Sequence, residues 1–297
     1  MTEAEFLAAL RALPLHAGAR GLMDDAAVLG RQVLTLDTLV EGVHFLGNDP
    51  PGDIAWKLMA VNLSDLAAKG AVPVGALLSY ALGDDDWDQA FLAGLTEAAS
   101  ALACPLLGGD TVRAPAGSPR VLTLTAIGES DAAPSRTGAQ ASDALWITGT
   151  VGDAGAGLTI AQGGAGPDAL LRRYRRPTPR LAEGRALAPH VHAMADVSDG
   201  LLIDAARMAA ASGLAVTVDL AAVPLSAAYR AHAGDARAVR LAAETAGDDY
   251  ELLFALPTGA APPVAATRVG GFGEGAGLTL TDGDTSLPIP SRLGFEH

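Results

Sequence analysis

Asp-Ile-Ala-Trp-Lys-Leu-Met-Ala-Val-Asn-Leu-Ser-Asp-Leu-Ala-Ala-Lys-Gly, residues 53–70, is the stretch that decides the fold of this chain. Its apolar residues recur at helical spacing, Asp53 can cap the helix, and Gly70 ends it. Runs with strand character lie on both sides, from Val33 to Asp37 and from Gly75 to Leu82. A strand, a helix and a second strand in succession predict a mixed α/β fold.

The same signals continue along the N-terminal half. A further strand is predicted from Arg120 to Gly128, and a helix that starts at Asp84-Asp85-Asp86 and runs to Ala103. Negative charge is favourable at a helix N-terminus. We therefore interpret the triple aspartate as a helix cap and not as a metal site.

A domain boundary is predicted between Glu129 and Asp143, because this stretch is rich in Ala, Ser, Pro and Gly and has no apolar period. We expect an N-terminal domain of residues 1–133 and a C-terminal domain of residues 134–297. The second domain should contain strands at 144–151, 215–220, 250–256, 268–272 and 278–281, and helices after Gly152 and at 201–211. The predicted fold class is α/β (α+β), with two mixed domains.

Charge and composition exclude several classes of partner. The chain has 20 Lys and Arg against 34 Asp and Glu, a net charge of −14, which argues against nucleic acid or an anionic membrane surface. The single cysteine, Cys104, excludes an internal disulfide and fits a reducing compartment. There is no run of 18 or more uncharged apolar residues, and the N-terminus is acidic. We expect a cytoplasmic protein.

Five short acidic stretches are expected where strands or loops end. They are Met23-Asp24-Asp25, Leu36-Asp37-Thr38, Asn62-Leu63-Ser64-Asp65, Gly108-Gly109-Asp110 and Asp196-Val197-Ser198-Asp199. Carboxylate and hydroxyl oxygens suit Mg²⁺, which proteins commonly hold together with substrate phosphates. The sequence contains neither a P-loop nor the glycine-rich loop of protein kinases, so metals would have to hold any phosphates. Magnesium-nucleotide chemistry is the first hypothesis.

Each of these features also has a simpler explanation. Asn62, Asp65 and Lys69 form one stripe on the predicted helix, and a solvated helix face accounts for such a stripe. A lone histidine such as His44 is more often structural than functional. The cationic run from Arg172 to Arg176, followed by proline, is typical of a helix C-terminus.

Taken together and in order, the motifs resemble the bacterial thiamine-monophosphate kinases. The segments that carry the resemblance include Asp37-Thr38-Leu39-Val40-Glu41-Gly42-Val43-His44-Phe45, Arg176-Pro177-Thr178-Pro179-Arg180, Gly247-Asp248-Asp249-Tyr250-Glu251 and Gly294-Phe295, besides the acidic stretches. The resemblance implies the superfamily of aminoimidazole ribonucleotide synthetase and selenophosphate synthetase. It implies a homodimer whose N-terminal domains contribute strands to a shared β-barrel, a C-terminal α/β sandwich, and a nucleotide bound between the domains.

The resemblance also implies the site residues. Ligands of several Mg²⁺ ions would be Asp25, Thr35, Leu36 through its backbone, Asp37, Asp65, Asp110, Asp196 and Asp199. Contacts to ATP, the co-substrate, would be Gly109, Asp110, Arg136 and Ser198. Contacts to thiamine phosphate would be His44, Asp248, which stands where glutamate is usual, and Phe295, which replaces a common tryptophan. The implied reaction is direct in-line transfer to thiamine phosphate, giving thiamine diphosphate, with no general base.

Two other functions stay open from the sequence. One is an ATP-dependent synthetase of the same superfamily with another acceptor, although the segment from Asp37 to Phe45 differs from the signatures of those relatives. The other is a non-catalytic magnesium-nucleotide binding protein that kept the acidic loops.

Overall fold

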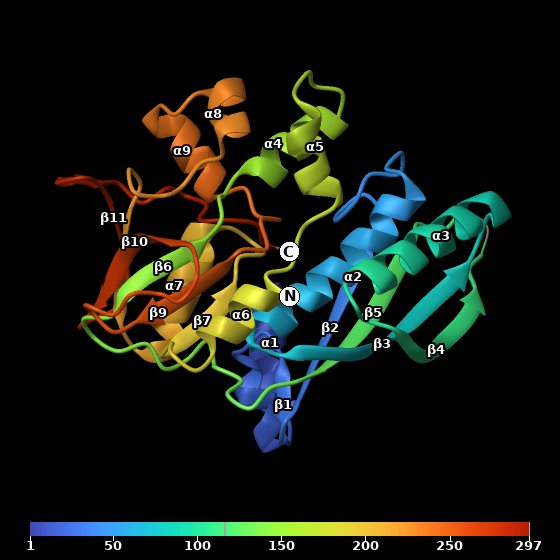
Figure 1. Ribbon diagram of the computed structural model, residues 1–297, viewed down its shortest axis with the longest axis horizontal. Coiled ribbons are helices and arrows are strands. Elements are labelled where there is room, and N and C mark those ends of the chain that lie inside the picture. Colours follow the sequence, from blue (N-terminus) through green and yellow to red (C-terminus); the bar gives the residue numbers. More distant parts are fainter. Residues whose placement is uncertain (116, 297) are drawn as a thin grey trace.

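The structure is a computed structural model that describes residues 1–115 and 117–296. Its strands form two sheets, one from each half of the sequence, and helix α2 (Pro51–Ala68) lies between them (Figure 1). The segment between Glu129 and Ala144 contains neither helix nor strand and connects the sheets. The fold is thus a mixed α/β arrangement with two parts.

The N-terminal sheet has α2 and α3 (Asp85–Ala101) packed together beside it. In spatial order its strands are β1 (Ala27–Leu29), β2 (Gln32–Val40), β5 (Val121–Glu129), β3 (Val72–Leu82) and β4 (Leu106–Arg113). β3 and β4 are parallel, as the intervening helix α3 requires, and the other pairs are antiparallel. Helix α1 (Glu3–Arg11) and the 3₁₀ segment η1 (Ala17–Leu22) precede this sheet.

The C-terminal sheet is mixed and larger. In spatial order its strands are β12 (Thr285–Leu287), β11 (Gly277–Asp282), β8 (Ala215–Asp219), β10 (Ala266–Gly273), β6 (Ala144–Thr148), β9 (Leu252–Leu256) and β7 (Ala193–Asp196). Its helices are α4 (Asp153–Ala161), α5 (Asp168–Arg175), α6 (Leu181–Leu187), α7 (Leu201–Ser212), α8 (Ala227–Ala233) and α9 (Arg237–Glu244). Helix α7 contacts β7, β8, β9 and β11 and so covers one face. Among the described residues neither sheet closes into a barrel.

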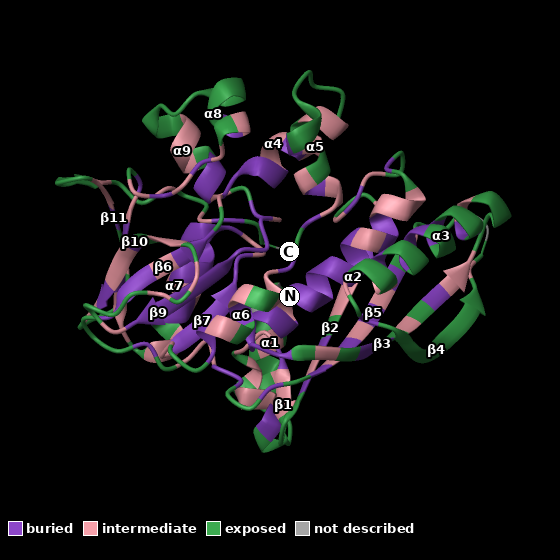
Figure 2. Ribbon diagram, viewed as in Figure 1, coloured by how far each residue is buried: buried purple, intermediate pink, exposed green. Residues whose placement is uncertain are grey.

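Helix α2 is buried on nearly all sides (Figure 2). It packs on the N-terminal sheet and on α3, and also contacts α5, α6 and β7 of the other half. Asn62 and Lys69 are each 0% exposed, so the solvated-face explanation of the polar stripe is wrong. The helix begins at Pro51, a favoured first position, and not at Asp53, which lies in the first turn.

A small apolar cluster joins the two halves. It includes Ala67 of α2, Leu187 of α6, Met194 of β7 and Phe254 of β9. The crossing of α6 over α2 is close, because a Cβ atom on Gly184 would lie 2.0 Å from the carbonyl oxygen of Ala67. The two halves therefore meet through close backbone packing.

Several predicted boundaries are shifted. β2 runs on to Val40, so Asp37 lies inside a strand, and Gly109 and Asp110 lie inside β4 and not at a strand end. The interpretation of the triple aspartate as a cap is confirmed, since the Asp84 carboxylate accepts a hydrogen bond from the Trp87 amide (3.0 Å). Cys104 is buried as a free thiol.

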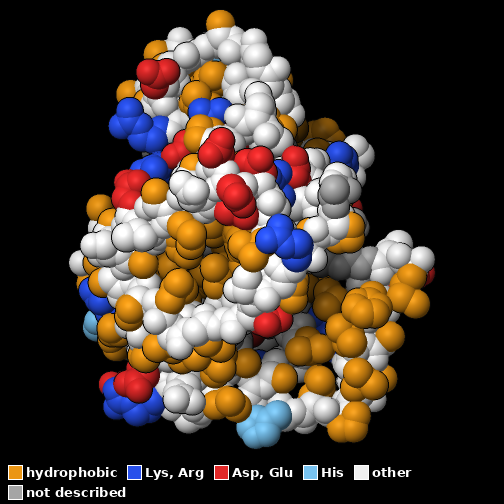
Figure 3. All heavy atoms as spheres, turned by 90° about the vertical axis from the view of Figure 1, so that its right-hand side faces the viewer, with side chains coloured by type: hydrophobic (Ala, Val, Ile, Leu, Met, Phe, Trp, Pro, Cys, Tyr) orange, Lys and Arg blue, Asp and Glu red, His pale blue; other side chains and the backbone are white. Residues whose placement is uncertain are grey.

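Apolar side chains are also exposed on the N-terminal sheet. They are Leu36, Val72, Val74, Leu77, Leu106, Leu107, Val112 and Val121. Figure 3, which views the molecule from the side where α3 and β4 lie in Figure 1, shows apolar side chains gathered over much of that face. No helix among the described residues is long and apolar enough to span a bilayer.

Candidate active site at the junction of the two sheets

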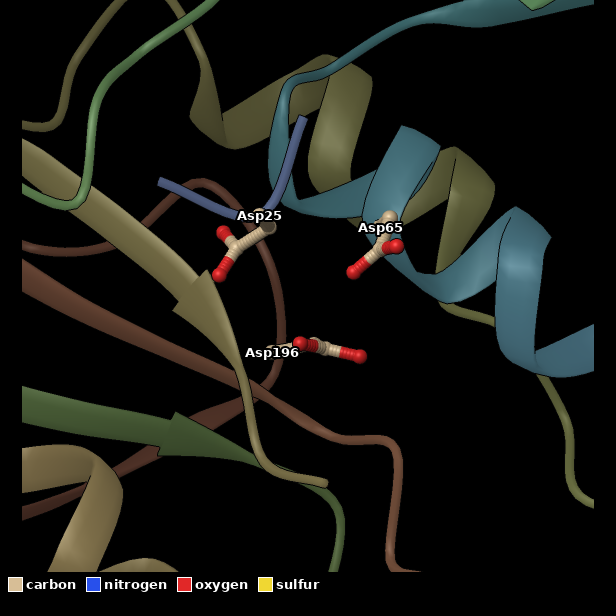
Figure 4. A group of neighbouring side chains, drawn as sticks. All are labelled: Asp25, Asp65 and Asp196. Atoms are coloured by element: carbon tan, nitrogen blue, oxygen red, sulfur yellow. The ribbon is translucent and has the colours of Figure 1, made fainter. Parts of the chain in front are cut away.

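Three aspartates from distant segments meet at the junction (Figure 4). Asp25 lies just before β1, Asp65 lies on α2, and Asp196 ends β7. One carboxylate oxygen from each lies within 4.8 Å of the others. A strand of the C-terminal half, a helix of the N-terminal half and the segment before β1 therefore build one acidic cluster, and the charge of Asp25 also acts on the nearby Asp37.

Burial and mutual repulsion raise the free energy needed to ionise the carboxyl groups of this cluster. Loss of water and the nearby charges of Asp25 and Asp199 raise the pKa of Asp37 to about 6. Burial, followed by repulsion from neighbouring carboxylates, also raises the pKa of Asp65 and of Asp196 well above the usual range. A divalent cation would relieve that repulsion, and the oxygen donors are those that Mg²⁺ prefers.

Neutral donors orient the cluster. The Thr35 hydroxyl donates to Asp65, and the Ser64 hydroxyl donates to Asp196 over 2.6 Å. The amide oxygen of Asn62 accepts from the backbone N–H of Asp37 (3.1 Å). The sequence does not predict the roles of Asn62 and Ser64; the available signal is two polar residues beside Asp65 in a largely apolar stretch of α2.

A buried lysine pairs with one carboxylate of the cluster. The buried Lys69 ammonium lies 2.8 Å from Asp25 and also pairs with Asp24. Burial alone would raise the pKa of Asp24, but Lys69 and Arg20 lower it to about 2. Asp24 also accepts from the hydroxyl of Ser135 (3.0 Å), so it anchors the connecting segment. The site residues that the family resemblance implies include neither Asp24 nor Lys69.

Arg136 reaches the cluster from the connecting segment. Its guanidinium pairs with Asp25, and the attraction of Asp25 and Asp204 outweighs burial and raises the pKa of Arg136 further. Arg136 is thus a fixed positive charge beside the carboxylates.

The implied substrate residues lie in the same pocket as the cluster. This cavity of about 290 Å³ is lined by residues that include Asp37, His44, Asp65, Asp196, Ser198, Asp199, Asp248 and Phe295. The structure therefore brings the predicted acceptor residues together with five of the predicted metal and nucleotide residues.

Backbone contacts hold the acceptor residues in place. The Val40 N–H donates to Nδ1 of His44 (3.0 Å), so the neutral imidazole carries its proton on Nε2. The Asp248 N–H donates to the Ser198 carbonyl (2.7 Å), and the Phe295 N–H donates to the Asp199 carbonyl (2.8 Å). The loop from Asp196 to Asp199 thereby holds two of the predicted acceptor residues, Asp248 and Phe295, beside the predicted metal ligands Asp196 and Asp199; these two sides are called the acceptor end and the metal end of the pocket.

Three predicted residues do not meet the cluster within this chain. Gly109 and Asp110 are exposed on β4, which β3 and β5 separate from β2. Leu36 has an exposed side chain, so only its backbone could contribute.

Comparisons with known proteins agree with this geometry. Residues 23–130 match the AIR synthase related protein N-terminal domain, and residues 140–279 match its C-terminal domain. The thiamine-monophosphate kinase of Caulobacter vibrioides is 39% identical, with 93% of this chain and 84% of the relative covered. The chain belongs to the thiamine-monophosphate kinase family. As a member of this family it is a phosphotransferase.

Other members of the thiamine-monophosphate kinase family are similar in sequence and in structure. The Salmonella typhimurium enzyme is 41% identical, covering 80% of this chain and 76% of the relative. A solved structure described as "AaThiL complexed with AMPPCP and TMP" superposes with a TM-score of 0.86 at 28% identity, covering 100% of this chain and 97% of that one. The Stenotrophomonas maltophilia thiamine-monophosphate kinase structure gives 0.77 at 37% identity, covering 95% of each chain.

Proposed function

We propose that this protein transfers the γ-phosphoryl group of ATP to thiamine phosphate, giving thiamine diphosphate and ADP. The observation that carries the proposal is the shared pocket, in which His44, Asp248 and Phe295 lie with Asp65 and Asp196. The similar structure with AMPPCP, an ATP analogue, and TMP supports both substrates.

We assign the residue roles by family resemblance. The proposed Mg²⁺ ligands are Asp25, Thr35, Leu36 through its backbone, Asp37, Asp65, Asp110, Asp196 and Asp199. The proposed ATP contacts are Gly109, Asp110, Arg136 and Ser198, and the proposed acceptor contacts are His44, Asp248 and Phe295. The acidic cluster fits Mg²⁺ because its donors are oxygens, they converge, and repulsion among them needs a counter-charge.

The reaction needs positioning and charge compensation more than proton transfer. Bound Mg²⁺ ions would neutralise the phosphates of donor and acceptor as they approach. The acceptor monoester has a second pKa near 6, so its attacking oxygen is largely deprotonated at neutral pH and the chain supplies no general base. Arg136 offers charge-assisted hydrogen bonds to the triphosphate, and the Phe295 ring offers a surface for a flat heterocycle.

We also propose a homodimer formed through the N-terminal sheet, with domains of residues 1–133 and 134–297. Two features support it: the exposed apolar side chains on this sheet, and β4 as an exposed edge strand. β1 pairs with β2 only from Gln32 to Leu34, so pairing of β4 with residues 35–40 of β2 in a second copy would extend the sheets toward a shared barrel. It would also bring a partner's Gly109 and Asp110 near Asp37.

Light scattering tests the proposed homodimer. The measured mass should be twice the chain mass, and Leu107→Asp should shift the measured mass toward that of the monomer. A monomeric wild type would contradict this proposal.

Product analysis tests the proposed function. The protein is incubated with ATP, Mg²⁺ and thiamine phosphate, with free thiamine and an aminoimidazole precursor as control acceptors. We expect thiamine diphosphate and ADP in equal amounts from thiamine phosphate and nothing from the controls. If ATP binds but no thiamine diphosphate forms, the assignment is wrong.

A further inference from the structure

Lys57 is a buried cation at the acceptor end of the pocket. It is 2% exposed, and its ammonium donates to Asp248 Oδ2 (2.6 Å) and to the His44 carbonyl (3.0 Å). It also lies 4.4 Å from the centre of the Tyr174 ring. Lys57 therefore contacts two of the three proposed acceptor residues, although it does not itself line the pocket.

The Asp248 carboxylate is held at both oxygens. Lys57 holds Oδ2, and the Tyr250 hydroxyl donates to Oδ1 over 3.0 Å. The side chain nevertheless remains 32% exposed, which leaves it accessible from the pocket that it lines. The backbone at Asp248 is left-handed (φ 62°), a conformation that non-glycine residues rarely adopt without support.

We infer that Lys57 is a positioning residue that fixes the Asp248 carboxylate and the His44 loop relative to each other for acceptor recognition. This inference rests on the proposed function. A lysine on α2 spans the junction to Asp248, 191 residues away, and so sets the distance between two walls of the pocket. It also offsets the charge of Asp248, so the carboxylate recognises an amino-substituted heterocycle chiefly by accepting hydrogen bonds in a fixed direction.

Steady-state kinetics test this role with Lys57→Met, Lys57→Arg, Asp248→Asn and the Lys57→Met/Asp248→Asn double variant. We expect Lys57→Met to raise KM for thiamine phosphate about tenfold or more, because an oriented charged hydrogen bond is lost, and to leave KM for ATP within about twofold. Lys57→Arg should recover part of the loss. The double variant should be no worse than Asp248→Asn, since the two residues act as a unit.

Other kinetic outcomes overturn the inference. Equal changes in both KM values, or a loss of kcat alone that follows a fall in Tm, would make Lys57 merely structural. Fully additive effects in the double variant would mean that Lys57 does not act through Asp248. If Lys57→Met does not fold, Lys57→Gln provides the test, because it also removes the charge: a Lys57→Gln variant whose KM for thiamine phosphate, relative to its KM for ATP, equals that of wild type would likewise reject the inference.

A spectroscopic readout separates this inference from the proposed function. The chain has two lysines, Lys57 and Lys69, so ¹⁵N-lysine labelling gives two ammonium signals, with Lys69 as the internal reference. Asp248→Asn and added thiamine phosphate should each shift the Lys57 signal and leave Lys69 unchanged. If wild type makes no thiamine diphosphate while these shifts are present, the kinase assignment fails and the Lys57 role stands; absent shifts in an active enzyme reject the Lys57 role alone.

Discussion

The negative charges of the carboxylates are compensated in different ways at the two ends of the pocket. At the metal end, Asp37, Asp65 and Asp196 are oriented mainly by hydroxyl and amide groups, and their pKa values are raised. At the acceptor end and behind it, Asp248 pairs with Lys57, and Glu251 pairs with Arg173 and Arg180. At the acceptor end, where we propose that the carboxylate only orients the substrate, lysine and arginine side chains neutralise the negative charge. At the predicted metal end, Lys69 and Arg136 pair with Asp25, and Asp37, Asp65 and Asp196 make no ion pair among the described residues.

The largest expected effect comes from Asp65→Asn at the metal end. Turnover should fall on the order of 10²- to 10³-fold, because charge compensation in the transition state is lost, while binding of thiamine phosphate changes little. Single-turnover rates and direct binding measure the two. Asp282→Asn, which removes a carboxylate of a surface ion pair, is the matched control.

The stability of Asp65→Asn sharpens the comparison further. In metal-free buffer the variant should be no less stable than wild type, since one source of repulsion is gone. A large loss of stability there, or unchanged turnover, would remove Asp65 from the proposed metal site.

Glu251→Gln should have the opposite profile. The Glu251 carboxylate is 0% exposed and accepts hydrogen bonds from Thr148 (2.7 Å) and from Arg180 (2.6 and 2.5 Å). Removing its charge takes away the carboxylate that Arg173 pairs with and leaves Arg180 with Glu183, 3.7 Å away, so we expect a loss of about 3 kcal/mol in the free energy of unfolding, measured in urea. Glu274→Gln, at an exposed position, is the control. A Glu251→Gln variant as stable as wild type would show that the paired end is not held by its ion pairs.

Glu244 extends the comparison to a carboxyl group to which we assign no metal role and which forms no ion pair in the part of the chain that the structure describes. Among the described residues neither of its oxygens has a hydrogen-bond partner, and burial raises its pKa to about 9 from 4.5. The folded state therefore keeps a proton that the unfolded state loses above pH 4.5, so stability falls as pH rises toward 9.

Glu244→Gln should remove this dependence. Between pH 6 and 9, wild type should lose on the order of 1–3 kcal/mol more of its unfolding free energy than the variant does. Denaturant unfolding at several pH values measures the difference. Parallel curves for the two proteins would mean that Glu244 is ionised when folded.

The smallest effect is expected at the triple aspartate, an acidic cluster outside the pocket. Asp84→Ala removes the cap of α3 and should cost about 1 kcal/mol of stability with unchanged activity. Asp86→Ala, at an exposed position whose carboxylate makes no cap hydrogen bond, should cost less. A loss of activity in Asp84→Ala would reverse the interpretation of this cluster.

Periodicity predicted the main elements of the fold well. The α2 helix, the strands β2, β3 and β5, and the helix α7 lie close to their expected positions. β4 was missed because Gly108-Gly109-Asp110 has low strand propensity, and its parallel pairing with β3 is what holds it in strand conformation.

The site was predicted in its residue types but not in its contacts. The stripe of Asn62, Asp65 and Lys69 has the pattern of a solvated face, because the sequence of one helix does not reveal that both sides are covered. The cationic run after Arg172 was explained by the helix terminus alone. In the structure Arg175 and Arg176 also pair across the junction with Asp49, Asp53 and Glu97, contacts that depend on how the two halves dock.

The divided origin of the acidic cluster has a thermodynamic consequence. Asp25 and Asp65 belong to one half of the chain and Asp196 to the other, and all three converge only when the halves are docked. An ion held by all three would bind the docked state in preference to any state with the halves apart. Its binding free energy would then be added to the association of the halves by linkage. The ions that we propose for phosphoryl transfer would then also stabilise, reversibly, the contact between the two parts of the molecule.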